Sequence, residues 1–133
     1  MRLSLLLAAT LAATPVLAQD LCMTEMEHFE IAEKLDLGFG DVAPRFDCVD
    51  PMAPGEDIAC LTDNDLLAVS HLAEEAYVYA YENATGTKTD HANPPIDEAV
   101  EAELAACTDA DCLCGVYRQQ ISDALGGLSP LTN

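Results

Sequence analysis

Six cysteines, at positions 22, 48, 60, 107, 112 and 114, constrain this chain of 133 residues more than any other feature. The remaining sequence offers only a light core, because it has no Trp, three Phe and four Tyr. Its 24 Asp and Glu residues against five Lys and Arg also make a compact state repel itself. Disulfides contribute about 2–4 kcal/mol each, so three of them would offset both weaknesses. We therefore predict a small domain stapled by disulfides.

The N-terminus predicts the compartment in which these cysteines fold. Met1-Arg2 supplies a positive charge, residues 3–13 form an apolar run, and small residues close the segment at Ala18. This order is typical of a secretory signal peptide, and the run is too short for a membrane span of roughly 20 apolar residues. We predict that residues 1–18 are a signal peptide, cleaved between Ala18 and Gln19. The product is then periplasmic or secreted, where cysteines become oxidised.

The net charge of the exported product limits the classes of partner that it can bind. The formal net charge is −19, and the predicted signal peptide holds Arg2 and no acid, so the mature chain carries −20. Nucleic acids and anionic membrane surfaces repel such a protein, whereas a cationic protein partner is attracted. Cys22 lies near the cleavage site, but Asp20-Leu21 before it do not form a lipoprotein box. We expect no membrane anchor.

Hydrophobic periodicity predicts an all-α fold, because β-branched residues are too scattered for strands. Residues 41–57 contain three prolines and are expected to be mostly irregular, and residues 83–95 form a long polar loop. The fold class is a small disulfide-stapled bundle of about three to four helices, with a helical hairpin at the C-terminus. The expected helices cover residues 24–35, 63–83, 96–106 and 110–125.

Local signals support the first two helices. Thr24 and Glu27 have the spacing of a capping box, and Asp63 or Asn64 can cap the second helix. The second helix has an apolar stripe of Leu66, Val69, Ala73, Ala76, Tyr77 and Ala80. Its acids, Glu74, Glu75 and Glu82, fall outside this stripe and are expected to be solvated.

The cysteine pairing is only partly determined by the sequence, because six cysteines allow 15 connectivities. Closeness in sequence favours Cys48–Cys60 across the proline-rich bend and Cys107–Cys112 across a tight turn. Cys22 and Cys114 are then left to pair with each other. Zinc bound by Cys107, Cys112, Cys114 and a histidine is an alternative. The spacing fits zinc poorly and the oxidising compartment favours disulfides, so we expect no metal.

Two sequence blocks resemble the LprI-type lysozyme-inhibitor family of small exported domains. The first is Phe46-Asp47-Cys48 followed by Cys60, before a long helix. The second is Cys107, then Cys112-Leu113 and Tyr117-Arg118. Together they cover about residues 45–125. The resemblance implies an LprI-like helical domain over residues 45–133, preceded by an N-terminal helical extension over residues 19–44.

The same resemblance implies a binding function, in which a rigid acidic domain occludes the cleft of a cationic lysozyme. We expect partner contacts from Asp90 and His91 in the long loop, and from Glu56 and Asp57 in the proline-rich bend. The alternative is a periplasmic immunity or envelope-maintenance protein whose partner is not lysozyme.

Catalysis and cofactors are not expected. The three histidines lie in three separate segments, and no nucleophile and base stand out together. A glycosidase would need two acids with shifted pKa values, whereas the acids here lie mostly outside the apolar stripes. Asp63-Asn64-Asp65 lacks the glycine and the distal glutamate of a calcium loop. We therefore predict a protein that is not an enzyme.

Overall fold

The protein is described by a computed structural model over residues 21–49, 54–61 and 65–126. The predicted signal peptide over residues 1–18 and its cleavage site lie outside these residues. The predicted all-α class is confirmed, because the described residues form helices and no strand. The helices are α1 (Glu25–Phe39), α2 (Pro54–Leu61), α3 (Leu66–Thr85), α4 (Glu98–Ala106) and α5 (Ala110–Ala124).

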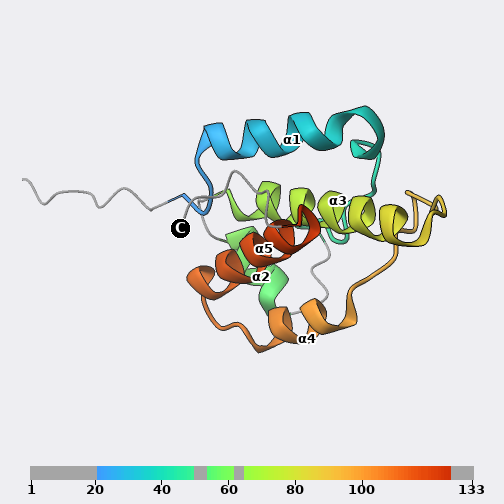
Figure 1. Cartoon of the computed structure of the whole chain (residues 1–133). Coiled ribbons are helices and arrows are strands. Elements are labelled where there is room, and N and C mark those ends of the chain that lie inside the picture. The colour runs from blue at the N-terminus through green and yellow to red at the C-terminus, as the bar shows by residue number, and fades with distance from the viewer. Residues whose placement is uncertain (1–20, 50–53, 62–64, 127–133) are drawn as a thin grey trace, which may run out of the picture.

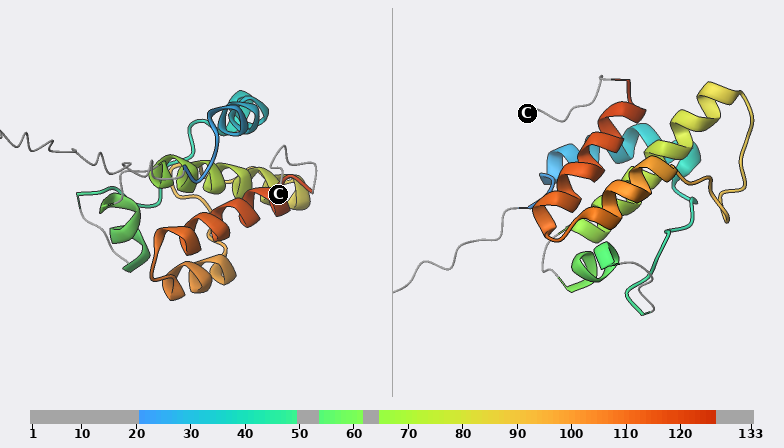
Figure 2. Two further views of the ribbon diagram at one scale, coloured as in Figure 1. Left: turned by 90° about the vertical axis from the view of Figure 1, so that its left-hand side faces the viewer. Right: turned by 90° about the horizontal axis from the view of Figure 1, so that it is seen from below.

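The longest helix, α3, lies at the centre of the molecule (Figure 1). It packs most extensively against α5 and carries α1 on its other side, so the three helices form successive layers (Figure 2). The predicted C-terminal hairpin is formed by α4 and α5, which contact each other. The short helix α2 contacts α3, α4 and α5.

The core is made of aliphatic side chains from α1, α3 and α5. The aliphatic members named below are at most 3 % exposed, and each buried Val, Leu or Ile side chain contributes about 1.5–3 kcal/mol. The alanines of α3 let neighbouring helices approach closely. Because two α1 residues belong to it, the N-terminal segment shares one core with the rest of the chain. The main members are Ile31, Leu35, Leu66, Val69, Leu72, Ala73, Ala76, Leu113 and Ile121.

Helix α1 begins at the predicted capping box. Thr24 Oγ1 accepts the Glu27 backbone N–H at 3.2 Å, and the Glu27 carboxylate accepts the Thr24 N–H at 2.8 Å. The helix continues to Phe39, beyond the predicted end at residue 35. Its outer face leaves Met26 and Phe29 exposed.

The prediction that residues 41–57 are mostly irregular was wrong at the C-terminal end of that segment, where helix α2 begins. With α2, the described residues contain five helices rather than three to four. Pro54 is tolerated because the first turn of a helix has no intrahelical N–H partner to lose. Glu56 and Asp57 follow in the first turn, where the positive end of the helix dipole stabilises carboxylates. A side chain at Gly55 would approach the Leu104 carbonyl oxygen to 3.0 Å, so glycine permits the close packing of α2 on α4.

The C-terminus of α3 and the N-termini of α4 and α5 are set by their capping residues. Gly86 ends α3 with a φ of +66° and donates its N–H to the Glu82 carbonyl at 2.8 Å. Asp97 and Asp109 cap α4 and α5 with their carboxylates. The predicted caps Asp63 and Asn64 lie outside the described residues.

All three expected disulfides are present: Cys22–Cys114, Cys48–Cys60 and Cys107–Cys112. They indicate an oxidising compartment outside the cytoplasm. Among the described residues, no helix combines the length and the apolar character that crossing a bilayer requires.

Cys22 joins three helices at one point. Its disulfide reaches α5, and its backbone N–H donates to Asp65 Oδ1 at 2.7 Å, directly before α3. Arg118 donates to the Cys22 carbonyl at 3.0 Å and also pairs with Glu27 of α1 at 3.2 Å. The Arg118 hydrogen bond lowers the pKa of the Glu27 carboxyl.

The disulfides should therefore differ in their contribution to stability. Replacing Cys22 and Cys114 together with Ala should lower the free energy of unfolding by roughly 4–5 kcal/mol, because that bridge closes the longest loop. The same change at Cys107 and Cys112 should cost only about 2 kcal/mol, since it opens a loop of five residues. Urea unfolding of both double variants measures this difference, and equal losses would contradict it.

Candidate functional site

The four residues predicted to contact a partner lie in two separate places. Asp90 and His91 line a shallow hollow beyond the end of α3, together with Asp41. Glu56 lies at the start of α2, where it is buried and lines a different, deeper pocket. Asp57 is exposed beside it.

His91 fastens the long loop to the rest of the molecule. Its Nδ1 lies 2.7 Å from Asp41 Oδ1 and its Nε2 lies 3.0 Å from Glu82 Oε1, so the ring bridges two carboxylates. The same Glu82 oxygen accepts the Thr89 backbone N–H at 2.8 Å. The His91 ring also packs against Phe39, with 5.6 Å between ring centroids. We call Asp41, Glu82, Thr89 and His91 the loop clamp.

The hydrogen bonds of the loop clamp shift the pKa values of its residues. The Asp41 hydrogen bond, followed by the one from Glu82, raises the pKa of His91. The reciprocal hydrogen bond lowers the pKa of Asp41. The pKa of Glu82 is lowered first by the Thr89 backbone N–H. The expectation that Glu75 and Glu82 would be solvated was wrong, because each is only 8 % exposed, and the loop folds back over Glu82.

Asp90 remains at the surface and shapes the loop. Its carboxylate accepts the Ala92 backbone N–H at 3.0 Å and the Asn93 side-chain amide at 2.9 Å. The Asn93 hydrogen bond is the main reason for its lowered pKa. Asp90 therefore presents a fixed negative charge at a defined position.

The loop clamp should weaken as the pH rises. A histidine whose pKa is raised by folding stabilises the native state below its unfolded pKa of about 6.5 and loses that effect as the pH passes its folded pKa. His91→Gln should therefore be more destabilising at pH 5.5–6 than at pH 8.5. Thermal unfolding of both proteins across this range measures the effect, with the His91 ring protons followed by NMR. A stability difference independent of pH would contradict it.

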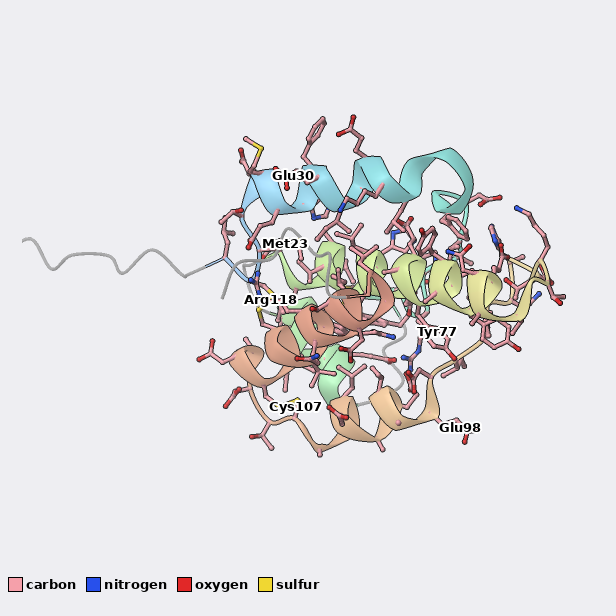
Figure 3. The ribbon with its side chains drawn as sticks, in the orientation of Figure 1. Met23, Glu30, Tyr77, Glu98, Cys107 and Arg118 are labelled. Atoms are coloured by element: carbon pink, nitrogen blue, oxygen red, sulfur yellow. A yellow bond between two sulfur atoms is a disulfide. The ribbon has the colours of Figure 1, made fainter. Side chains whose placement is uncertain are left out.

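The deeper hollow, which we call the central pocket, lies where all of the helices except α1 approach one another. It encloses about 80 Å³, enough for several waters or a small ligand. Tyr77 extends from α3 on the side that faces α4 (Figure 3). Its main lining residues are Arg45, Phe46, Glu56, Ser70, Glu74, Tyr77, Pro94, Ile96, Asp97, Glu101, Leu104, Leu113 and Tyr117.

Arg45 is the one basic side chain among the pocket's lining residues, and two helices share it. Its guanidinium forms a two-pronged ion pair with Glu101 of α4. On the side of α3, its Nε lies 3.8 Å from Glu74, and its backbone N–H donates to Glu74 at 3.0 Å. The described segment before α2 is thereby held between α3 and α4.

Glu74 is the most perturbed acid of the pocket. Burial raises its pKa to about 7, against the lowering effects of Arg45 and His71, and the nearby Glu56 charge raises it further. The prediction that Glu74 would be solvated was wrong, because the segment containing Arg45 covers the polar side of α3. Burial also raises the pKa of Tyr117 to about 12, so its hydroxyl stays neutral in this wall.

Sequence reasoning missed Arg45, Glu74 and Glu101 as a group. They come from a loop and two helices, and the spacing within one helix cannot reveal a pocket formed between several. One signal was available, because Arg45 is among only four Lys and Arg residues that remain after residue 18. A rare cation in a strongly acidic chain is a candidate for burial between carboxylates.

The described residues contain no group of three or more His, Cys, Asp or Glu side chains that could hold a metal ion. Comparisons with protein-family models, with curated proteins and with solved structures found no match.

Glu74 should make the protein less stable as the pH rises. The pKa of Glu74 is about 7 in the folded protein and 4.5 in the unfolded chain, so the folded state binds more protons between these pH values. The free energy of unfolding therefore falls as the pH rises from about 4.5 to about 7. The effect is at most about 3 kcal/mol. Glu74→Gln keeps an oxygen for the Arg45 N–H and should flatten this part of the curve. Urea unfolding from pH 4.5 to 8 compares the two proteins, and parallel curves would contradict the assignment.

Proposed function

We propose that the protein is an exported binding protein for a cationic protein partner, and that the partner is a lysozyme whose cleft it occludes. One observation carries the proposal: a scaffold braced by three disulfides presents fixed carboxylates in a chain with a formal net charge of −19. The choice of lysozyme comes from the resemblance of the two cysteine blocks to LprI-type inhibitors.

Rigidity supports a binding role because a preordered surface loses little conformational entropy on association. Asp90 is held by its own turn, and the loop around it is fastened to α3 through His91 and Glu82. Asp57 is exposed at the start of α2. Asp90 can therefore meet a partner without reorganisation, and Asp57 adds a second accessible negative charge.

Charge supports a fast association with a cationic partner. Opposite net charges steer the encounter and raise the association rate, whereas added salt screens this attraction beyond about 8 Å at physiological strength. The effect acts mainly on association, because dissociation depends on the short-range contacts. In this proposal the protein binds and blocks its partner without chemistry of its own.

Inhibition can be tested with the fully oxidised protein and a cationic lysozyme in a cell-wall lysis assay. We expect inhibition at low salt and an association rate that falls steeply between about 20 and 300 mM salt, while dissociation changes little. Stopped-flow or surface-based kinetics separates the two rates. Undiminished lysis at low salt and high molar excess would overturn the lysozyme assignment.

Two conservative variants distinguish local contacts from total charge. Asp90→Asn removes one charge but keeps an oxygen for the Ala92 N–H, and should slow association about threefold. Glu30→Gln removes one charge from the exposed face of α1, away from the loop, and should have a smaller effect (Figure 3). Equal effects of the two variants would contradict a contact through the loop.

The alternative is an immunity or envelope-maintenance protein with another cationic partner. It would retain the salt-dependent association but leave lysozyme active. Capture on immobilised lysozyme, followed by the same lysis assay, separates binding without inhibition from the absence of binding.

A further inference from the structure

We propose that the central pocket binds a small organic cation, an alkylammonium with an apolar chain. The shape of the pocket is the first argument. It is a partly enclosed cavity of about 80 Å³, and most of its wall is apolar, with Ile96, Leu104 and Leu113 among its lining residues. Such a wall accommodates hydrocarbon, and a few polar groups then select the ligand.

The charges of the pocket select a cation. Its lining includes four carboxylates, Glu56, Glu74, Asp97 and Glu101, and a single guanidinium. That guanidinium, Arg45, is engaged most closely by Glu101. Asp97 is turned to its helix, where it accepts the Ala99 and Val100 N–H groups. The pocket therefore has more negative than positive charge in a site with limited access to water.

The aromatic side chains favour the same class of ligand. Phe46, Tyr77 and Tyr117 line the cavity, and the faces of such rings attract ammonium groups. An anion would be repelled by the carboxylates, since the one cation of the pocket, Arg45, is already paired with Glu101, and a neutral alcohol would leave the charge imbalance unchanged. An ammonium with a short hydrocarbon chain matches both the acidic and the apolar parts of the wall.

Titration of Glu74 should be linked to binding. Arg45 and the nearby His71 favour its ionised form, Glu56 and burial oppose it, and the other titratable groups that line the pocket are Asp97, Glu101, Tyr77 and Tyr117. A bound ammonium favours the carboxylate, so at neutral pH it displaces a proton from Glu74. Affinity should therefore increase as the pH rises through about 7, while an alkylammonium stays charged.

The test is an NMR titration of the full, oxidised protein with 1-aminopentane, with 1-pentanol and pentanoate as neutral and anionic controls. We expect saturable shifts of the Tyr77 and Leu104 resonances with the amine alone, and tighter binding at pH 8 than at pH 6. Equal shifts with the alcohol, or affinity independent of pH, would overturn the proposal.

Variants complete the test. Glu74→Gln should weaken amine binding about tenfold at pH 8, because it removes the carboxylate that pairs with the ammonium. Glu98→Gln is the matched control, since Glu98 is exposed on α4 and does not line the pocket, and it should leave affinity within about twofold. Equal losses in the two variants would overturn the assignment. If Glu74→Gln does not fold, the pH dependence of the wild-type protein decides alone.

Discussion

The covalent and polar junction at Cys22 determines how this fold is assembled. A disulfide to α5, an N–H donated to Asp65 before α3, and a carbonyl held by Arg118 meet at one residue. Without this junction, α1 would be attached mainly by its aliphatic contacts with α3. A light core in a strongly acidic chain makes such a junction necessary, because hydrophobic burial must also offset charge repulsion.

Local signals predicted the parts of the fold that depend on a single helix. The capping box at Thr24 and Glu27, the stripe of α3 and the hairpin across Cys107 and Cys112 involve neighbours in sequence. Helix α2 was not predicted because the three prolines of residues 41–57 indicate irregular chain, although one of them, Pro54, is at the first helical position, where proline favours a helix start. The Cys22–Cys114 disulfide was predicted only because these two cysteines are left once the two local pairs are formed.

The candidate site was less predictable for a physical reason. Helical periodicity says which face of α3 meets its main neighbours, but it does not say that an irregular segment crosses the opposite face. Arg45 and the long loop both do so, and they bury Glu74 and Glu82 on the side expected to be solvated. The perturbed acids therefore arise from packing between distant segments, a property that no single segment displays.

The short segment from Asp41 to Arg45 connects the two hollows. Its first residue binds His91, Ala43 donates its N–H to the His91 carbonyl at 2.8 Å, and its last residue binds Glu74 and Glu101. Four peptide units span at most about 14 Å, so the loop and the pocket cannot move far apart without displacing this segment. A partner that lifts the loop would pull on Arg45, and an ammonium that pairs with Glu74 would act on the same segment through the Arg45 N–H that Glu74 accepts. Occupancy of either hollow would then change the affinity of the other by the same factor, since such coupling is reciprocal.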